Sequence, residues 1–148
     1  MLKNLIFLLL LLIIVTACAD TSEIESRLIG SWQVEADIFF PDFKNEITSP
    51  LEIEKGQKLK SDDVVQVVEY FEDGTYLLTQ DGKPHENGTY EIKSQTRFKW
   101  VNTKDPNQPL SCEGEFSLQA DKFIRTCKDT YQGATVYRKT VMVRVTNE

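Results

Sequence analysis

Between residue 31 and the end of the chain, short segments of alternating apolar and polar residues follow one another, separated by turn-forming residues. The first segment covers positions 31–40, where the apolar side chains are Trp32, Val34, Ala36, Ile38 and Phe40. A period of two over this length predicts a strand that buries one of its faces. No stretch after residue 30 carries a helical period long enough to predict a helix, so this part of the chain is restricted to a β fold.

Seven further strands are expected at positions 64–72, 75–80, 87–93, 97–102, 110–118, 122–128 and 135–145. Eight short strands joined in sequence by turns predict an all-β fold, an eight-stranded antiparallel up-and-down barrel. Such a barrel is filled by side chains or leaves room for one small ligand. The long polar stretch at positions 41–62, which holds Pro41, Pro50 and Gly56, is interpreted as a loop or lid.

The N-terminus has the features of a targeting segment. Lys3 precedes an apolar run of 11 residues at positions 5–15, which is short of the ~20 residues that cross a membrane. Residues Val15-Thr16-Ala17-Cys18 end this run and resemble the lipobox of bacterial lipoproteins. The resemblance implies cleavage after Ala17, a lipid on Cys18 and anchoring in the cell envelope. Ala19 rather than Asp follows Cys18, which by the same resemblance favours the outer membrane where a cell has two membranes.

These features divide the chain into a lipoprotein signal peptide at 1–17, a lipidated tether at 18–26 and a barrel domain at 27–148. Within the tether, Ser22 and Glu25 have the spacing of a capping box, and Ile24 and Leu28 form an apolar i,i+4 pair, which predicts a short helical turn.

Cys112 and Cys127 remain after removal of the signal segment. In an exported protein such a pair indicates a disulfide more often than a metal site or a redox-active dyad. The two cysteines lie symmetrically about a turn centred between Gln119 and Ala120. A hairpin with this turn places Cys112 opposite Cys127, Phe116 opposite Phe123, and Gly114 opposite Arg125. Directly opposed residues are close to disulfide distance.

The charge of the chain restricts its partners. Loss of residues 1–17, whose one charged residue is Lys3, leaves 16 Lys and Arg against 23 Asp and Glu, a net charge of −7. This charge argues against nucleic acid as a partner. The acidic residues are scattered, which favours a solvated surface over an acidic docking face for a basic protein.

The sequence offers little for catalysis. His85, the single histidine, lies among turn residues, where a solvated side chain is the simplest interpretation. No nucleophile elbow, phosphate-binding loop or dinucleotide fingerprint is present. We therefore expect a non-enzymatic protein without a metal or cofactor.

Aromatic residues give the candidate ligand contacts. Pairing across Asp73-Gly74 places Phe71 opposite Tyr76, on a face shared with Val67 and Leu78. The candidate binding residues are Trp32, Phe71, Tyr76, Trp100, Arg125 and Tyr137. They form either an apolar cup for a hydrophobic molecule or the packed core of a small barrel. If Arg125 points inward, it needs a buried carboxylate or a ligand head group as its partner; if it points outward, it is an ordinary surface residue.

Four features resemble the lipocalin-like lipoproteins of bacteria: Gly30 and Trp32 in a Gly-x-Trp pattern, the long loop after the first strand, the segments FEDGTY (71–76) and GTYEI (88–92), and Tyr137-Arg138 in the last strand. The resemblance implies that Trp32 closes the narrow end of the barrel and that Arg138 packs on it. Strand parity leaves the side of Arg138 open, because an inward-facing Tyr137 turns Arg138 outward.

Two functions follow as expectations. The first is a lipid-anchored envelope protein whose lipocalin-like barrel binds a small hydrophobic or amphipathic molecule. The second is a protein-binding barrel, such as an inhibitor of a lytic enzyme or an accessory subunit of an envelope complex. An open cup favours the first function, and a packed interior favours the second.

Overall fold

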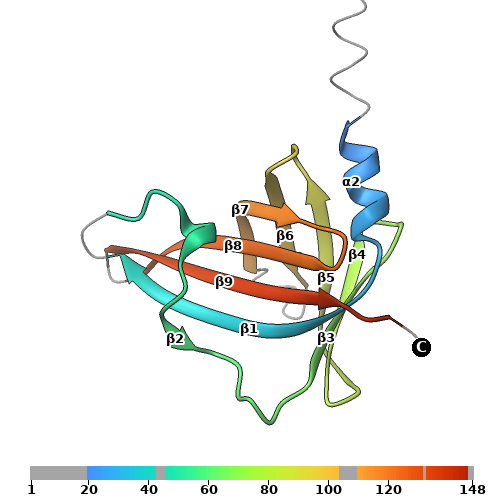
Figure 1. Cartoon of the computed structure of the whole chain (residues 1–148), viewed down its shortest axis with the longest axis horizontal. Helices are drawn as coiled ribbons and strands as arrows, with labels where there is room; N and C mark the ends of the chain where they lie inside the picture. The colour runs from blue at the N-terminus through green and yellow to red at the C-terminus, as the bar shows by residue number, and fades with distance from the viewer. Residues whose placement is uncertain (1–19, 43–45, 104–109, 132, 147–148) are drawn as a thin grey trace, which may run out of the picture.

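A computed structural model of the chain describes residues 20–42, 46–103, 110–131 and 133–146 (Figure 1). The expected signal segment 1–17 and the lipidation site Cys18 lie outside the described residues. The strands and core residues reported below belong to residues 20–146.

The described residues form one helix, one short 3-10 helix and nine strands. Their bounds are α2 (Asp20–Leu28), β1 (Gly30–Asp42), η1 (Pro50–Glu52), β2 (Gln57–Lys58), β3 (Gln66–Tyr70), β4 (Thr75–Gln80), β5 (Lys83–Ile92), β6 (Arg97–Asn102), β7 (Leu110–Leu118), β8 (Lys122–Tyr131) and β9 (Ala134–Arg144). Strands β3 to β9 pair in chain order, and β1 pairs with both β3 and β9. The predicted eight-stranded antiparallel barrel is therefore confirmed, with the two-residue β2 as an addition.

Helix α2 stands at one end of the barrel, where the sequence predicted a tether with a single helical turn (Figure 1). The apolar side chains of Leu28 and Ile24 hold α2 against the barrel, because Leu28 is fully buried and Ile24 packs against the core. Gly30 follows with a φ of +114°, a conformation that favours glycine, and turns the chain into β1. None of the described helices combines the length and apolar character that a membrane span requires.

Trp32 closes this end of the barrel, as predicted. Its side chain is fully buried, and its indole Nε1 donates a hydrogen bond to the carbonyl of Leu28 at 2.7 Å. The cation that packs on it is Arg144, whose guanidinium lies 4.2 Å from the ring centroid. The expectation that Arg138 does so was wrong, because Arg144 is the residue paired with Trp32 in the β1–β9 ladder.

Strand β1 changes the side on which its residues lie. The β1–β9 register shifts between Val34 and Ala36, and this bulge interrupts the alternation seen in the sequence. Beyond it, Asp37 lies on the inner face, opposite Thr140, while Phe40 lies on the outer face. The predicted inward face is therefore correct for Trp32 and Val34 and wrong after the bulge.

The β3–β4 hairpin is shifted by one residue from its predicted register. Tyr70, not Phe71, pairs with Tyr76, because residues 72–74 form a three-residue connection that is closed by a hydrogen bond from the Phe71 amide to the Thr75 carbonyl at 2.9 Å. A slip of one residue exchanges the two faces of a strand. Tyr70 and Val68 consequently fill the core in place of Phe71 and Val67.

The β7–β8 hairpin contains the predicted disulfide, with a Cα–Cα distance of 5.7 Å between Cys112 and Cys127. The other predicted pairings were wrong: Phe116 lies opposite Arg125, and Leu118 lies opposite Phe123. The register differs by two residues between these pairs and the disulfide, with Gly114 in between. A Cβ at Gly114 would lie 1.7 Å from the carbonyl oxygen of Thr126, so only glycine permits the close approach of the two backbones there.

The stretch at 41–62 was predicted as a loop or lid, and part of it packs on the wall of the barrel. Residues 46–58 are named the outer strap; its η1 lies against β7, β8 and β9 (Figure 1). The ammonium of Lys139 donates hydrogen bonds to the carbonyls of Leu51 and Ile53. Lys139 alternates along β9 with the inward-facing Arg138 and Thr140, so the strap covers the outer face.

Candidate binding site at the open end of the barrel

Aromatic side chains fill most of the barrel interior. Tyr70 occupies its middle, with ring centroids 5.0 Å from Tyr90, 5.9 Å from Phe123 and 6.2 Å from Tyr76. The core also contains Leu28, Trp32, Val34, Val68, Ile92, Phe98, Trp100, Phe116 and Met142. The interior is therefore a packed core rather than a deep cup.

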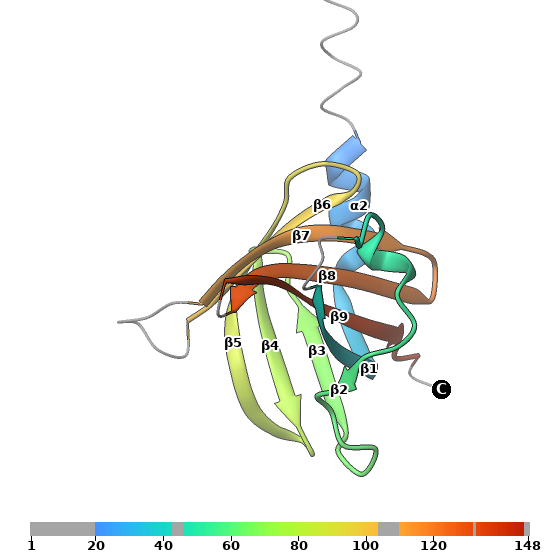
Figure 2. The ribbon, with the colours of Figure 1, turned by 90° about the vertical axis from the view of Figure 1, so that its left-hand side faces the viewer.

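Two adjoining hollows remain toward the other end of the barrel. Strands β1 and β8 finish at this end and β9 begins there, and Figure 2 views the ribbon from this side. The inner chamber has a volume of about 20 Å³ and is lined by the disulfide, Phe98, Trp100, Arg125, Arg138 and Thr140. The mouth pocket has a volume of about 190 Å³ and adds Phe39, Asp129, Val136 and Tyr137. Trp100, Arg138 and the disulfide line both hollows, so the chamber lies next to the mouth pocket. A volume of about 20 Å³ holds little more than one water molecule.

Arg138 and Asp37 form a bidentate ion pair beside the chamber. The guanidinium donates from Nε to Oδ1 at 2.8 Å and from Nη2 to Oδ2 at 2.6 Å. The Asp37 side chain is only 5% exposed, and the hydroxyl of Thr140 lies 3.4 Å from Oδ1. These hydrogen bonds from Arg138 to Asp37 raise the pKa of Arg138, so the guanidinium stays protonated at any physiological pH.

Arg125 also lines this chamber, but it lies against aromatic rings rather than against a carboxylate. Its guanidinium lies 5.4 Å from the ring centroid of Trp100 and 5.8 Å from that of Phe98, within cation–π range. Its one hydrogen bond to a described residue is donated to the hydroxyl of Tyr70 at 3.4 Å. Within the described part of the chain, no carboxylate oxygen lies within 4.0 Å of Arg125.

Two buried tyrosines complete the polar network. The hydroxyl of Tyr76 donates to Glu86 at 2.7 Å, and burial together with Glu86 raises the pKa of Tyr76. Burial also raises the pKa of Tyr70, an effect that the nearby charge of Arg125 partly opposes. Both phenols therefore stay protonated at neutral pH.

The structure brings together some of the predicted contacts and separates others. Trp100 and Arg125 meet in the chamber, and Tyr137 lines the mouth pocket while stacking on Phe40 with centroids 5.6 Å apart. Tyr76 lies in the core, stacked on Trp100 at 6.3 Å. Trp32 lies at the closed end, and Phe71 lies in the turn between β3 and β4, so neither lines these two hollows.

The sequence interpretation missed Asp37, Phe39, Arg138 and Val136 as residues of this site. Other lining residues that it did not predict as binding contacts are Phe98, Ser111, Thr126, Asp129 and Thr140. Asp37 and Phe39 were placed on the wrong faces because the bulge in β1 leaves no mark in the apolar pattern. Arg138 and Val136 were missed because Tyr137, Val141 and Val143 looked like the inward set of β9, whereas Met142 and Thr140 are the more deeply buried residues. An acidic residue on β1 and a basic residue on β9 could have indicated an ion pair at this site. Sequence alone, however, does not pair Asp37 with Arg138.

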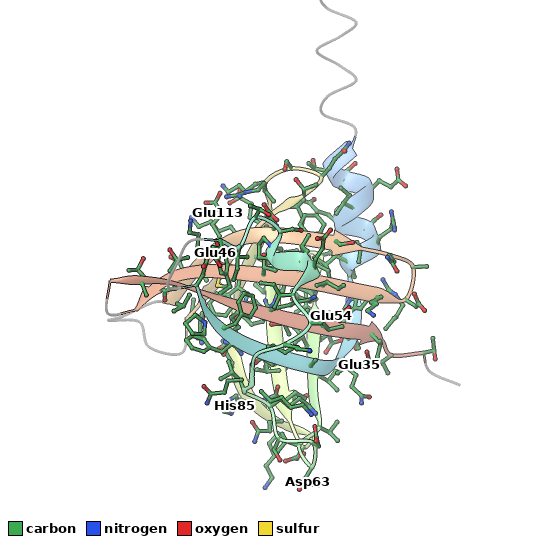
Figure 3. All side chains as sticks on the ribbon, turned by 60° about the vertical axis from the view of Figure 1, so that its left-hand side comes forward. Glu35, Glu46, Glu54, Asp63, His85 and Glu113 are labelled. Atoms are coloured by element: carbon green, nitrogen blue, oxygen red, sulfur yellow. A yellow bond between two sulfur atoms is a disulfide. The ribbon has the colours of Figure 1, made fainter. Side chains whose placement is uncertain are left out.

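His85 does not form a cluster with the carboxylates labelled in Figure 3. His85 lies on β5 rather than in the predicted turn, because a bulge in the β4–β5 ladder between Leu78 and Thr79 lets the strand begin at Lys83. It is exposed, and Figure 3 shows it far from Glu46 and Glu113. Of the carboxylates labelled there, Glu35 lies on β1 and Glu113 on β7, whereas Glu46, Glu54 and Asp63 lie outside the helices and strands. Among the described residues, no group of three or more His, Cys, Asp and Glu side chains could hold a metal ion.

A groove at the closed end carries negative charge. It has a volume of about 500 Å³ and lies between α2 and the turn after β3, and its lining includes Glu25, Glu72, Asp73 and Glu91.

The chain matches no protein-family model and no curated protein. The features that bear on function are therefore the barrel itself, the mouth pocket at its open end and the acidic groove at its closed end.

Proposed function

We propose that the protein is a non-enzymatic, lipid-anchored protein of the bacterial cell envelope whose lipocalin-like barrel binds one small hydrophobic or amphipathic molecule. The observation that carries the proposal is the mouth pocket, in which apolar side chains surround an opening above a floor that contains two arginines. An apolar wall with a few convergent polar groups is typical of small-molecule sites.

The pocket limits the size of the molecule. The side chains of Phe39, Trp100 and Val136, with the disulfide, offer apolar contact to the body of a ligand. The volume of about 190 Å³ is below the range of about 300–1,000 Å³ for sites of drug-sized molecules. The site therefore fits a compact molecule, or one end of a longer one.

Support for the anchor comes from the sequence at Cys18. The lipobox-like residues 15–18 end two positions before α2 begins, so a lipid on Cys18 would hold the closed end of the barrel near the membrane. Cys18→Ser should abolish incorporation of labelled palmitate and release the protein from the membrane fraction. Retention of the label in this variant would contradict lipidation at Cys18. The favoured address, the outer membrane, is tested by fractionation of the two membranes.

Native mass spectrometry tests the binding function. Residues 20–148, which contain the whole barrel, are exported to the periplasm without the anchor and purified. We expect a mass excess that disappears on denaturation, and its value gives the chemical class of the ligand. A bare chain at the expected mass, two hydrogens lighter for the disulfide, would count against a carried ligand.

A second candidate function rests on the packed interior and the acidic groove. Both fit a barrel that binds a basic protein, such as a lytic enzyme that it inhibits or a subunit of an envelope complex. Under this function the mass spectrum shows a bare chain. Cross-linking through a photoreactive group at position 72 then captures a protein, and Glu25→Gln with Glu91→Gln weakens the capture.

A further inference from the structure

The inner chamber contains two cationic groups but only one ion pair. Arg138 is bound by both oxygens of Asp37, whereas Arg125 has no carboxylate within 4.0 Å among the described residues. Glu86, a half-buried acid of the network, accepts a hydrogen bond from Tyr76. Of the two guanidinium groups that line the chamber, that of Arg125 therefore has no carboxylate in contact among the described residues.

The guanidinium of Arg125 also has spare hydrogen-bonding capacity. An arginine carries five N–H donors, and Arg125 uses one of them on a described residue, the hydroxyl of Tyr70. None of the buried side-chain nitrogen and oxygen atoms among the described residues is both sealed from solvent and without a partner. Arg125 lines the chamber, and among the described residues only the Tyr70 hydroxyl accepts a hydrogen bond from it.

The rings of Phe98 and Trp100 hold this guanidinium in place without neutralising it. Cation–π contacts at 5.8 and 5.4 Å orient the planar group and leave its charge intact. A fixed, partly desolvated guanidinium with free N–H groups is the arrangement that binds planar anions, since two parallel N–H donors match the two oxygens of a carboxylate.

We propose that the ligand is a small organic carboxylate, whose head group occupies the inner chamber against Arg125 and whose apolar body fills the mouth pocket. This inference rests on the proposed binding function and specifies its ligand. The chamber volume of about 20 Å³ accepts a flat carboxylate more readily than a tetrahedral phosphate or sulfate ester. The mouth pocket adjoins the chamber, because Trp100, Arg138 and the disulfide line both, so a ligand with its head group at Arg125 would pass these side chains.

Calorimetric titration of residues 20–148 with two probes of equal chain length, octanoate and 1-octanol, tests the inference. Both probes carry the same apolar body, so any preference reports the head group. We expect octanoate to bind about tenfold more tightly or better, because a hydrogen bond to a charged group adds roughly that factor. Equal affinities in the unmodified chain would overturn the carboxylate inference and leave the binding function standing. Failure of both probes to bind would overturn both.

Two variants assign the preference to one side chain. Arg125→Met keeps an unbranched stem and removes the charge; it should abolish the preference for octanoate while the affinity for 1-octanol stays within about twofold. Arg97→Met removes an exposed arginine on β6 and should retain the full preference. A preference that survives in Arg125→Met would overturn the role of Arg125. The comparison of the two probes on the unmodified chain stands even if Arg125→Met does not fold.

Discussion

At the scale of single residues, the ion pair between Asp37 and Arg138 is the least replaceable contact of the site. Asp37 is almost fully buried, and three donors converge on it from β9. Removing the charge of Asp37 leaves Arg138 without a counterion at the floor of the mouth pocket, and loss of a partner in a buried pair is more damaging than loss of the whole pair.

Asp37→Asn should lower the free energy of unfolding by about 2 kcal/mol, measured by urea denaturation. The matched control is Glu113→Gln, which breaks the exposed pair with Arg97 at 3.6 Å, where the side chains are 48% and 52% exposed. The control should change stability by no more than about 0.5 kcal/mol. Equal effects of the two substitutions would contradict the special role of Asp37.

The buried phenols predict how stability depends on alkaline pH. Burial raises the pKa of Tyr70 and Tyr76, and raises that of Tyr90 to about 12, against about 10 in an unfolded chain. Above about pH 10 the unfolded state therefore loses protons that the folded state keeps, and the free energy of unfolding falls as the pH rises toward the folded pKa values. Below about pH 10 this contribution is fully present.

Urea denaturation on either side of pH 10, combined with phenolate absorbance, checks this dependence. Stability should decline above about pH 10, and the three shifted tyrosines should ionise together with unfolding. Tyr76→Phe should make the decline shallower, since it removes one of the shifted groups. Ionisation of Tyr70, Tyr76 and Tyr90 near the usual value of about 10 in the folded protein would contradict the buried network.

At the scale of elements, the sequence was sufficient for the strands but not for their registers. Alternation and turn residues located β4, β6 and β7 to the residue. The register, however, depends on how many residues each turn uses and on where a bulge inserts one more. The three-residue connection before Thr75 exchanged Phe71 for Tyr70, and the bulge after Val34 turned Asp37 inward. Trp100 was placed correctly on the face of Phe98 because β6 has no bulge. The sequence left the side of Arg125 open and paired it with Gly114, whereas the structure pairs it with Phe116.

The β7–β8 hairpin depends on its disulfide. The bond closes a segment with a sequence separation of 15 residues, and a loop of this size is stabilised by about 3 kcal/mol in the chain-entropy model. The double variant Cys112→Ala with Cys127→Ala should lower the unfolding midpoint without abolishing the fold, and reduction of the unmodified chain should do the same. Identical midpoints for the oxidised and reduced chains would contradict the pairing of these cysteines.

At the scale of the whole molecule, the two ends of the barrel are built differently. The closed end is sealed by α2, by Trp32 and by Arg144, which donates hydrogen bonds to the carbonyls of Ile29, Ala120 and Arg27. The open end has a hollow floor and a mouth that the outer strap leaves uncovered. Under the proposed function, this asymmetry would place the lipid anchor and the binding site at opposite ends of the barrel.

Arg144→Met should loosen the closed end. The variant loses a cation–π contact and three hydrogen bonds, and we expect it to lower the free energy of unfolding by about 3 kcal/mol. Amide hydrogen exchange in α2 should accelerate more than exchange in β6, which lies away from Arg144. Arg97→Met serves as the control and should leave both measurements unchanged. Unaltered protection of α2 in the Arg144 variant would show that other contacts hold the helix.

An amide-resolved NMR titration of residues 20–148 with octanoate shows directly whether the open end of the barrel binds the ligand. We expect the chemical-shift changes to concentrate at Phe39, Trp100, Cys127 and Val136, which line the mouth pocket, with Trp32 and the turn at Gly74 unaffected. Changes that concentrate in the groove beside α2, or no changes at saturating octanoate, would contradict this expectation.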